Sequence, residues 1–73
     1  MSKYVTLDRV AVISVMARKN ITSDELTQRA SVGRSSVYKV RKGKSVYRTT
    51  AQHVATALGV PLEELLEEGG GAK

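Results

Sequence analysis

Residues 22–43, TSDELTQRASVGRSSVYKVRKG, contain the local signals for two short helices joined by a tight turn. The segment Thr22–Glu25 is a capping box, in which the threonine and glutamate side chains each accept a hydrogen bond from an otherwise unpaired backbone amide. We therefore predict a first helix that ends at Ala30. Residues 31–33 have the composition of a turn, and a second helix is predicted over residues 34–42.

The second of these helices has little apolar surface. Val37 and Val40 are its apolar, non-aromatic residues, and they lie three positions apart on one stripe, before Gly43 as a C-cap. Such a helix contacts the core along one seam and exposes the rest, so that it can enter a DNA major groove about 12 Å wide. Two helices that pack steeply across a short turn need apolar residues at their contact. The residues that meet this need are Leu26, Ala30, Val32, Val37 and Val40.

A further helix is predicted ahead of this pair. Thr6 can cap a helix that runs to about Lys19, with Asp8 in its first turn, where the helix dipole favours an acid. Residues 10–15 also have the β-branched composition of a strand. We favour a helix because the flanking residues are helix formers and no later segment has the pattern of a pairing strand.

Two more helices are predicted after residues 44–48, a polar and basic loop. A second capping-box pattern, Thr49–Gln52, starts a helix that Gly59 ends, and Pro61 opens a short last helix. The predicted fold is therefore all-α, a small five-helix bundle. Its expected parts are an N-terminal arm at 1–6, the helical domain at 7–68 and a flexible tail at 69–73.

Composition restricts the class of function. The chain has 73 residues, enough for one domain, and no cysteine, which excludes a disulfide framework and a cysteine-based zinc site. His53 is the single histidine, and the glutamate pairs near the C-terminus have the spacing of a solvated helix face. We expect no metal, no cofactor and no enzymatic activity. No segment resembles a membrane span or a signal peptide, so we expect a cytoplasmic protein.

The charge is distributed unevenly along the chain. The formal net charge is +5. Between Arg29 and Arg48 there are seven basic residues and no acidic one, whereas the segment from Pro61 onward has four acidic residues and one basic residue. A basic block inside a folded domain is typical of a polyanion-binding surface. An ordinary solvated face has the same composition, so charge alone leaves both interpretations open.

Five segments have a more specific pattern: Ile21–Leu26, Ala30–Val37, Lys42–Gly43, Ala55–Val60 and Leu62–Leu66. In them the chain resembles the helix-turn-helix domains of lambdoid phage repressors, Cro proteins and their wider bacterial relatives. The similarity runs without gaps, and the last two segments lie outside the helix-turn-helix itself. A weaker similarity to the LacI-type headpiece exists at Val46, Thr50 and Val54. That family normally has no helix before its helix-turn-helix, so it fits less well.

Three positions depart from the pattern of the repressor and Cro family. Thr27 and Ser31 stand where its members usually have alanine and glycine, and Ser23 stands where glutamine is frequent. We expect Ser31 to adopt a left-handed backbone conformation at some cost, because only glycine does so freely. Ser23 is shorter than the glutamine that supports the recognition helix in the family, which puts this support in doubt.

The resemblance implies a lambda repressor-like DNA-binding domain that acts as a transcription regulator, a phage or prophage Cro protein or repressor. Its partner would be a palindromic double-stranded DNA operator, to which the protein binds as a homodimer. In free solution we expect the dimer to be weak or the protein to be monomeric. The expected base-reading residues are Arg34, Ser35, Lys39 and Tyr38. The expected phosphate contacts are Ser23, Lys42, Lys44, Arg48 and Thr49. The expected dimer contacts are Val46, Tyr47 and Leu62.

Two alternatives remain open at this stage. Tyr38 can contact a thymine methyl group or a phosphate, or it can pack back over the turn between the helices. The whole fold can also be a protein-interaction module, such as an antitoxin or antirepressor. The many apolar residues of the first helix favour that module. The acid-free basic block of residues 34–42 favours DNA.

Overall fold

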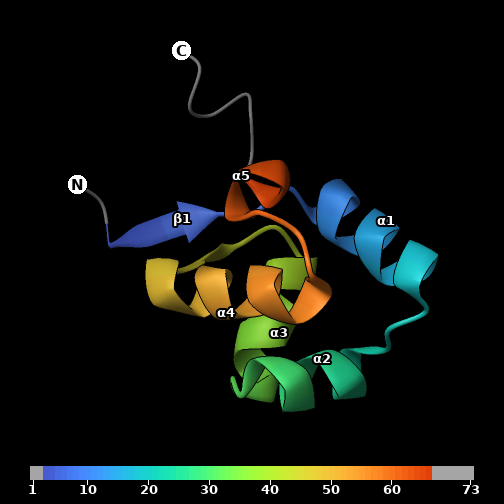
Figure 1. Ribbon diagram of the computed structural model, residues 1–73. Coiled ribbons are helices and arrows are strands. Elements are labelled where there is room, and N and C mark those ends of the chain that lie inside the picture. Colours follow the sequence, from blue (N-terminus) through green and yellow to red (C-terminus); the bar gives the residue numbers. More distant parts are fainter. Residues whose placement is uncertain (1–2, 67–73) are drawn as a thin grey trace.

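Helices α1 to α5 and strands β1 and β2 account for most of residues 3–66, which the computed structural model describes. Their order and bounds are β1 Tyr4–Thr6, α1 Arg9–Lys19, α2 Ser23–Ala30, α3 Arg34–Arg41, β2 Ser45–Tyr47, α4 Arg48–Leu58 and α5 Leu62–Leu65. Figure 1 shows α4 across the middle of the molecule, with α5 and β1 above it and α2 below. The tail predicted at 69–73 lies outside the described residues.

The strands correct the prediction of an all-α fold, which is only approximate. β1 pairs antiparallel with β2, with Tyr4 opposite Tyr47 and Val5 opposite Val46. Residues 44–48, which the sequence predicts to be a loop, therefore include a strand. Each strand has only three residues, which is too short for a period-two pattern to stand out from a loop.

The same pairing explains why α1 begins later than predicted. The predicted N-cap, Thr6, belongs to β1, and its hydroxyl group lies 3.2 Å from that of Ser45. The N-cap is Asp8, whose carboxylate accepts a hydrogen bond of 3.0 Å from the Val10 amide. Asp8 thus satisfies one of the free amides at the start of the helix. The helix predicted over residues 10–15, in preference to a strand, is confirmed.

Helix α4 also begins at a different residue from the predicted one. Its N-cap is Tyr47, and no side chain caps it. The capping box predicted at Thr49–Gln52 is therefore wrong, since these residues already lie inside the helix. The backbone amide of Arg48 donates instead to the Lys3 carbonyl at 2.8 Å, so the pairing of the two strands organises this helix start.

A single aliphatic core joins all the elements. Its buried members are Leu7, Val12, Val15, Met16, Ile21, Leu26, Ala30, Val37, Val40, Val46, Ala51, Val54, Ala55, Leu58, Leu62 and Leu65. Helix α3 contributes only Val37 and Val40, as its narrow apolar seam predicts. Helix α4 contributes four residues and crosses the centre of the molecule, so it is the support on which the other helices pack.

Candidate nucleic-acid interface

Helix α3 presents an exposed surface that is basic and lacks acids. Six of its eight residues lie at the surface or are half-buried, including Arg34, Lys39 and Arg41. Its N-cap is Gly33, which offers no side-chain hydrogen bond. The helix therefore depends on its core seam and on neighbouring elements for its position, while its outer surface is left to contact a ligand.

Helix α2, in contrast, is fixed by its own first turn. The Thr22 hydroxyl group accepts a hydrogen bond of 3.1 Å from the Glu25 amide, and the Glu25 carboxylate accepts one of 2.9 Å from the Thr22 amide. This confirms the predicted capping box. The backbone hydrogen bond from Thr22 holds the pKa of Glu25 below its usual value. The hydroxyl group of Thr27 donates to the Ser23 carbonyl at 2.9 Å, so it is paired within the helix.

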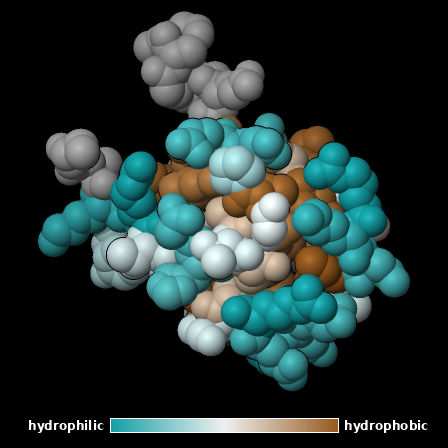
Figure 2. Space-filling view, in the orientation of Figure 1, coloured by the Kyte–Doolittle hydropathy of each residue, from teal (hydrophilic) through white to brown (hydrophobic). Residues whose placement is uncertain are grey.

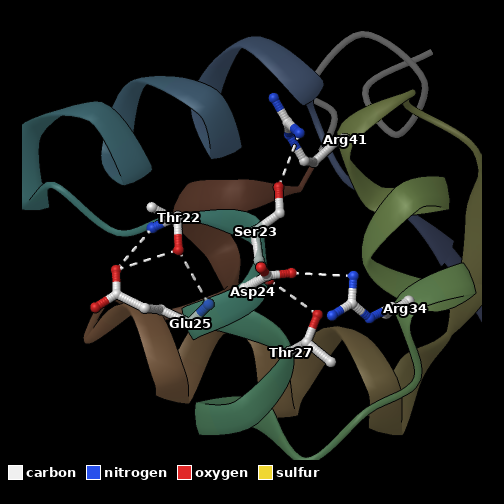
Figure 3. A network of polar contacts seen from close by, with 7 residues as sticks. All are labelled: Thr22, Ser23, Asp24, Glu25, Thr27, Arg34 and Arg41. Carbon is white, nitrogen blue, oxygen red and sulfur yellow. Dashed lines mark hydrogen bonds and ion pairs between the residues drawn. The ribbon is translucent and has the colours of Figure 1, made fainter.

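Two polar contacts join α2 to α3, and both are drawn in Figure 3. Arg34 forms an ion pair with Asp24, with 3.1 Å between Nη1 and Oδ1. The Arg41 guanidinium donates a hydrogen bond of 2.8 Å to the Ser23 hydroxyl group. The contact between Ser23 and the following helix, which the short side chain put in doubt, is thus present, because the long side chain comes from Arg41 on α3.

A groove of about 690 Å³ separates α3 from α1 and the start of α2. Four basic side chains line it: Arg9, Arg34, Arg41 and Lys42. Asp24 is the acid among its lining residues, and Ile13, Val37 and Tyr38 supply apolar surface. The groove therefore extends the positive surface of α3 toward the beginning of α1, a region that the sequence does not connect with it.

The residues expected to read bases lie together on the exposed side of α3. Ser35 and Lys39 are exposed near Arg34, at the N-terminal half and middle of the helix. Tyr38 is 58% exposed, and the Lys42 ammonium group lies 5.5 Å from the centre of its ring, within cation–π distance. Tyr38 also lines the groove, so its side chain has surface available to a ligand.

The residues expected to contact phosphate come from three places. Ser23 opens α2 and is half-buried, and Lys42 is the C-cap of α3. Lys44 is exposed just before β2, and Arg48 and Thr49 are exposed in the first turn of α4. Ser23 and Lys42 lie on the groove beside α3, whereas the other three lie after α3 in the chain, at β2 and α4.

Two of the three expected dimer contacts are buried within the chain itself. Val46 and Leu62 are only 5% and 6% exposed, because each packs into the core of its own chain. Tyr47 is 54% exposed, and its ring stacks on that of Tyr4 with 4.8 Å between centroids. A hydrogen bond with Tyr47 raises the pKa of Tyr4. Of the three residues, Tyr47 has the surface to meet a partner.

Three residues of this region were missed by the sequence reasoning. Asp24 has the appearance of an ordinary acid in the first turn of a helix, where the dipole favours it. Arg41 and Arg9 look like solvated bases. Their partners and the groove come from other helices, so no spacing along the chain identifies them. Only the packing angle of α2, α3 and α1 brings them together.

The described part of the chain lacks two other kinds of site. No group of three or more histidine, cysteine, aspartate or glutamate residues within residues 3–66 is arranged to hold a metal ion. No helix in the same range is long and apolar enough to cross a membrane.

Comparison with known families gives one match. The family model described as the Cro/C1-type HTH DNA-binding domain matches residues 11–67. This range includes most of α1, the α2–turn–α3 unit and all of α4 and α5. No curated protein and no solved structure matches the chain.

Proposed function

The chain belongs to the Cro/C1-type helix-turn-helix DNA-binding domain family, and on this premise we propose that it regulates transcription by reading a palindromic operator through the major groove. The same fold serves Cro proteins and repressors of phages and prophages, and we place this chain among them. Family membership supports DNA binding and a regulatory role. The operator and the dimer are the further steps of the proposal, and a cytoplasmic location goes with them.

The observation on which the proposal mainly rests is the outer surface of α3. Only Val37 and Val40 are buried, while Arg34, Ser35 and Lys39 project from a surface that has no acid. Helix-turn-helix proteins place the N-terminal residues of this helix against base edges. A helix whose function was structural would have no need of so many bases on its exposed side, where only Arg34 has an acidic partner among residues 3–66, and that acid lies on α2.

Four side chains of α3 are assigned to base contacts: Arg34, Ser35, Lys39 and Tyr38. The Arg34 guanidinium matches the O6 and N7 acceptors of guanine with two parallel hydrogen bonds, and Lys39 can donate to the same atoms. Ser35 can donate or accept, and the exposed ring of Tyr38 can contact a thymine methyl group. We therefore expect a half-site that contains guanine.

A second group of residues is assigned to the phosphates: Ser23, Lys42, Lys44, Arg48 and Thr49. Contacts of this kind fix the register of the protein and dominate affinity, but they do not distinguish sequences. The Arg48 amide is already bonded to Lys3, so this residue acts through its side chain. Counterion release then makes the binding constant fall steeply with salt concentration.

A homodimer on DNA completes the proposal. Each protomer offers one recognition helix, so a palindromic operator needs two protomers with half-sites about 34–36 Å apart. The stacked pair Tyr4 and Tyr47 is the exposed aromatic surface available to a partner. Because Val46 and Leu62 are used by the core of the chain itself, the dimer is expected to be weak or absent in free solution.

Selection of binding sites from random duplex DNA, at two salt concentrations, tests this function. We expect enrichment of a palindrome with guanine in each half-site. The Arg34→Ala variant is expected to lose about 1–3 kcal/mol of binding free energy on the selected duplex, and its base preference should be relaxed at one position of each half-site. Electrophoretic mobility shift assays with single-base operator variants measure both effects.

The Arg18→Ala variant provides a charge-matched control. Arg18 is exposed in the last turn of α1 and does not line the groove beside α3. Its replacement should leave the base preference unchanged. A pool that is not enriched would contradict sequence-specific recognition, and a salt dependence near zero would contradict DNA binding as a whole.

The protein-interaction module remains a second candidate because α1 exposes apolar side chains. Val10 is 60% exposed and Ile13 is 39% exposed, three positions apart on one side of the helix. Figure 2 shows hydrophobic surface in the region of α1 and α5, bordered by hydrophilic side chains. If the module is the function, duplex DNA should bind with neither sequence preference nor dependence on Arg34.

A further inference from the structure

We propose that Asp24 is a specificity-determining residue that positions Arg34 for guanine and withholds it from phosphates at other sites. The proposal rests on the DNA-reading function above and deepens it. Asp24 lies in the first turn of α2, and it meets Arg34 at the first position of α3. Figure 3 shows the two side chains facing each other across the space between the helices.

Asp24 is an unexpected residue for this surface. DNA is a dense array of phosphates, and an acid at its contact surface lowers affinity. The dipole of α2 favours an acid in its first turn, but Glu25 already serves there within the capping box. The dipole also does not require a contact with α3. The 3.1 Å ion pair with Arg34 is therefore the feature that needs an explanation.

The pair adds little to folding stability. The side chains of Arg34 and Asp24 are 80% and 68% exposed, and ion pairs so open to water contribute little because solvent and salt screen them. The contact does restrict the rotamers of Arg34. A side chain that is ordered before binding loses less conformational entropy when it meets its base.

The geometry of the guanidinium allows both partners at once. Arg34 has five N–H donors, of which guanine uses two through O6 and N7. The ion pair joins Nη1 to a single carboxylate oxygen of Asp24. The remaining donors can therefore form the two parallel bonds to guanine while Asp24 stays in place. The carboxylate then acts as a support for a base-reading residue.

The same carboxylate acts against other base pairs. Where guanine is absent, Arg34 would gain most by turning to a phosphate, as any surface arginine does. That movement would leave Asp24 unpaired beside the DNA backbone, where like charges repel. Asp24 thus weakens the binding of duplexes without guanine more than the binding of those with it.

The other cations of α3 beside the groove have neutral partners, which sets Arg34 apart. Arg41 donates to the Ser23 hydroxyl group, and Lys42 lies over the Tyr38 ring. Both keep their full charge for phosphates. Within residues 3–66, Arg34 is the base that forms an ion pair, and its partner is Asp24. The acid is therefore matched to the residue expected to read a base.

The Asp24→Asn variant tests the proposal, since it removes the charge and keeps the shape. The probes are the duplex enriched by the wild-type protein, the same duplex with its guanine pair replaced, and a random-sequence duplex. We expect the variant to bind the random duplex several-fold more tightly. The slope of the logarithm of its binding constant against the logarithm of salt concentration should be steeper by about the amount that one phosphate contact contributes. The preference for guanine at the Arg34 position should fall about three- to ten-fold.

Two controls separate positioning from a simple change of charge. Glu64→Gln makes the same charge change on α5, which Figure 1 places on the opposite side of α4 from α2. It should leave the guanine preference intact. In an Arg34→Ala background, Asp24→Asn should no longer alter base preference. Thermal unfolding by circular dichroism checks that each variant is folded.

The outcomes distinguish this inference from the function on which it rests. If the wild-type protein selects a guanine-containing site and Asp24→Asn keeps the full preference, Asp24 is only a surface charge and the inference fails alone. If Asp24→Asn changes preference equally with and without Arg34, Asp24 does not act through Arg34. If the wild-type protein selects no sequence, the proposed function fails and the inference fails with it.

Discussion

Helices α2 and α3 have the same length, eight residues, and are built in opposite ways. α2 has a complete capping box, two acids in its first turn and a base in its last. α3 has a glycine N-cap, no acid in its first turn and bases along its exposed side. α2 caps its own N-terminus with side chains and has acids near it, whereas α3 has neither a side-chain cap nor an acid at its N-terminus.

This difference shows how a small domain can present a helix to a ligand. The features that stabilise an isolated helix, namely acids near its start and a polar cap, would place negative charge where DNA phosphates must approach. α3 omits them and is held instead by its core seam and by the hydrogen bond from Arg41 to Ser23 on α2, while the exposed ion pair with Asp24 orients Arg34. Its order therefore depends on its neighbour.

Among the variants that test how α3 is held, Val40→Ala should have the largest effect on stability. Val40 is fully buried and is half of the seam that holds α3. Loss of two methyl groups and the cavity left behind should lower the free energy of unfolding by about 2–3 kcal/mol. A domain of this size has few kcal/mol to lose, so urea denaturation should detect a large fall in midpoint.

Val10→Ala removes the same atoms from a side chain that is 60% exposed on α1, so it is the matched control. It should change the free energy of unfolding by less than about 0.5 kcal/mol. Similar losses in the two variants would show that α3 is not held by its seam, and the contrast with α2 would then have no basis.

Thr22→Ala tests the other side of the contrast, the self-sufficiency of α2. The substitution removes the hydroxyl acceptor for the Glu25 amide and should destabilise the protein by about 1 kcal/mol. The second bond of the box should survive, because its donor is the backbone amide of residue 22. The pKa of Glu25 should therefore stay below its usual value, which an NMR titration of the carboxylate can follow.

Thr49→Ala is the control for a cap that the sequence predicts and the structure lacks. Thr49 lies inside the first turn of α4, where no side chain caps the helix. Its replacement should have little effect on thermal stability. If it destabilised the protein as much as Thr22→Ala, a second capping box would exist and α2 would not be distinctive.

The two capping patterns also show what the sequence could establish. Both have the right residues at the right spacing, yet only the one at Thr22 is formed. The pattern at Thr49 fails because the pairing of β1 with β2 fixes the chain up to Tyr47, which is the N-cap of α4 two residues before the predicted one. Local signals predicted the helices well, and the long-range strand pairing decided where α4 begins.

The candidate interface divides in the same manner. The exposed bases of α3 follow from the lack of apolar residues around Val37 and Val40, so the sequence identifies them. The pairs of Arg34 with Asp24 and of Arg41 with Ser23 do not follow from it, because they depend on the angle between two helices. The burial of Val46 likewise depends on strand pairing. The sequence does not predict this pairing, because the residues around Val46 are polar and have the composition of a loop.

The smallest expected effect concerns the turn that joins the two helices. Ser31 ends α2 with φ of 57°, in the left-handed region, as the glycine that the family usually has at this position led us to expect. Glycine adopts this conformation without strain but loses more chain entropy on folding, so Ser31→Gly should stabilise the protein by only about 0.5 kcal/mol. Thermal unfolding can resolve this difference.

Asn20→Gly, at φ of 58° after α1, is the matched control, and it should gain less because asparagine tolerates the left-handed region better than serine. The stronger test is base preference. If α3 is oriented by its seam and by α2, relief of strain at Ser31 should leave the selected DNA sequence unchanged. A changed selection would mean that the strained turn itself aims the recognition helix, and α3 would then depend on the turn as well as on its neighbour.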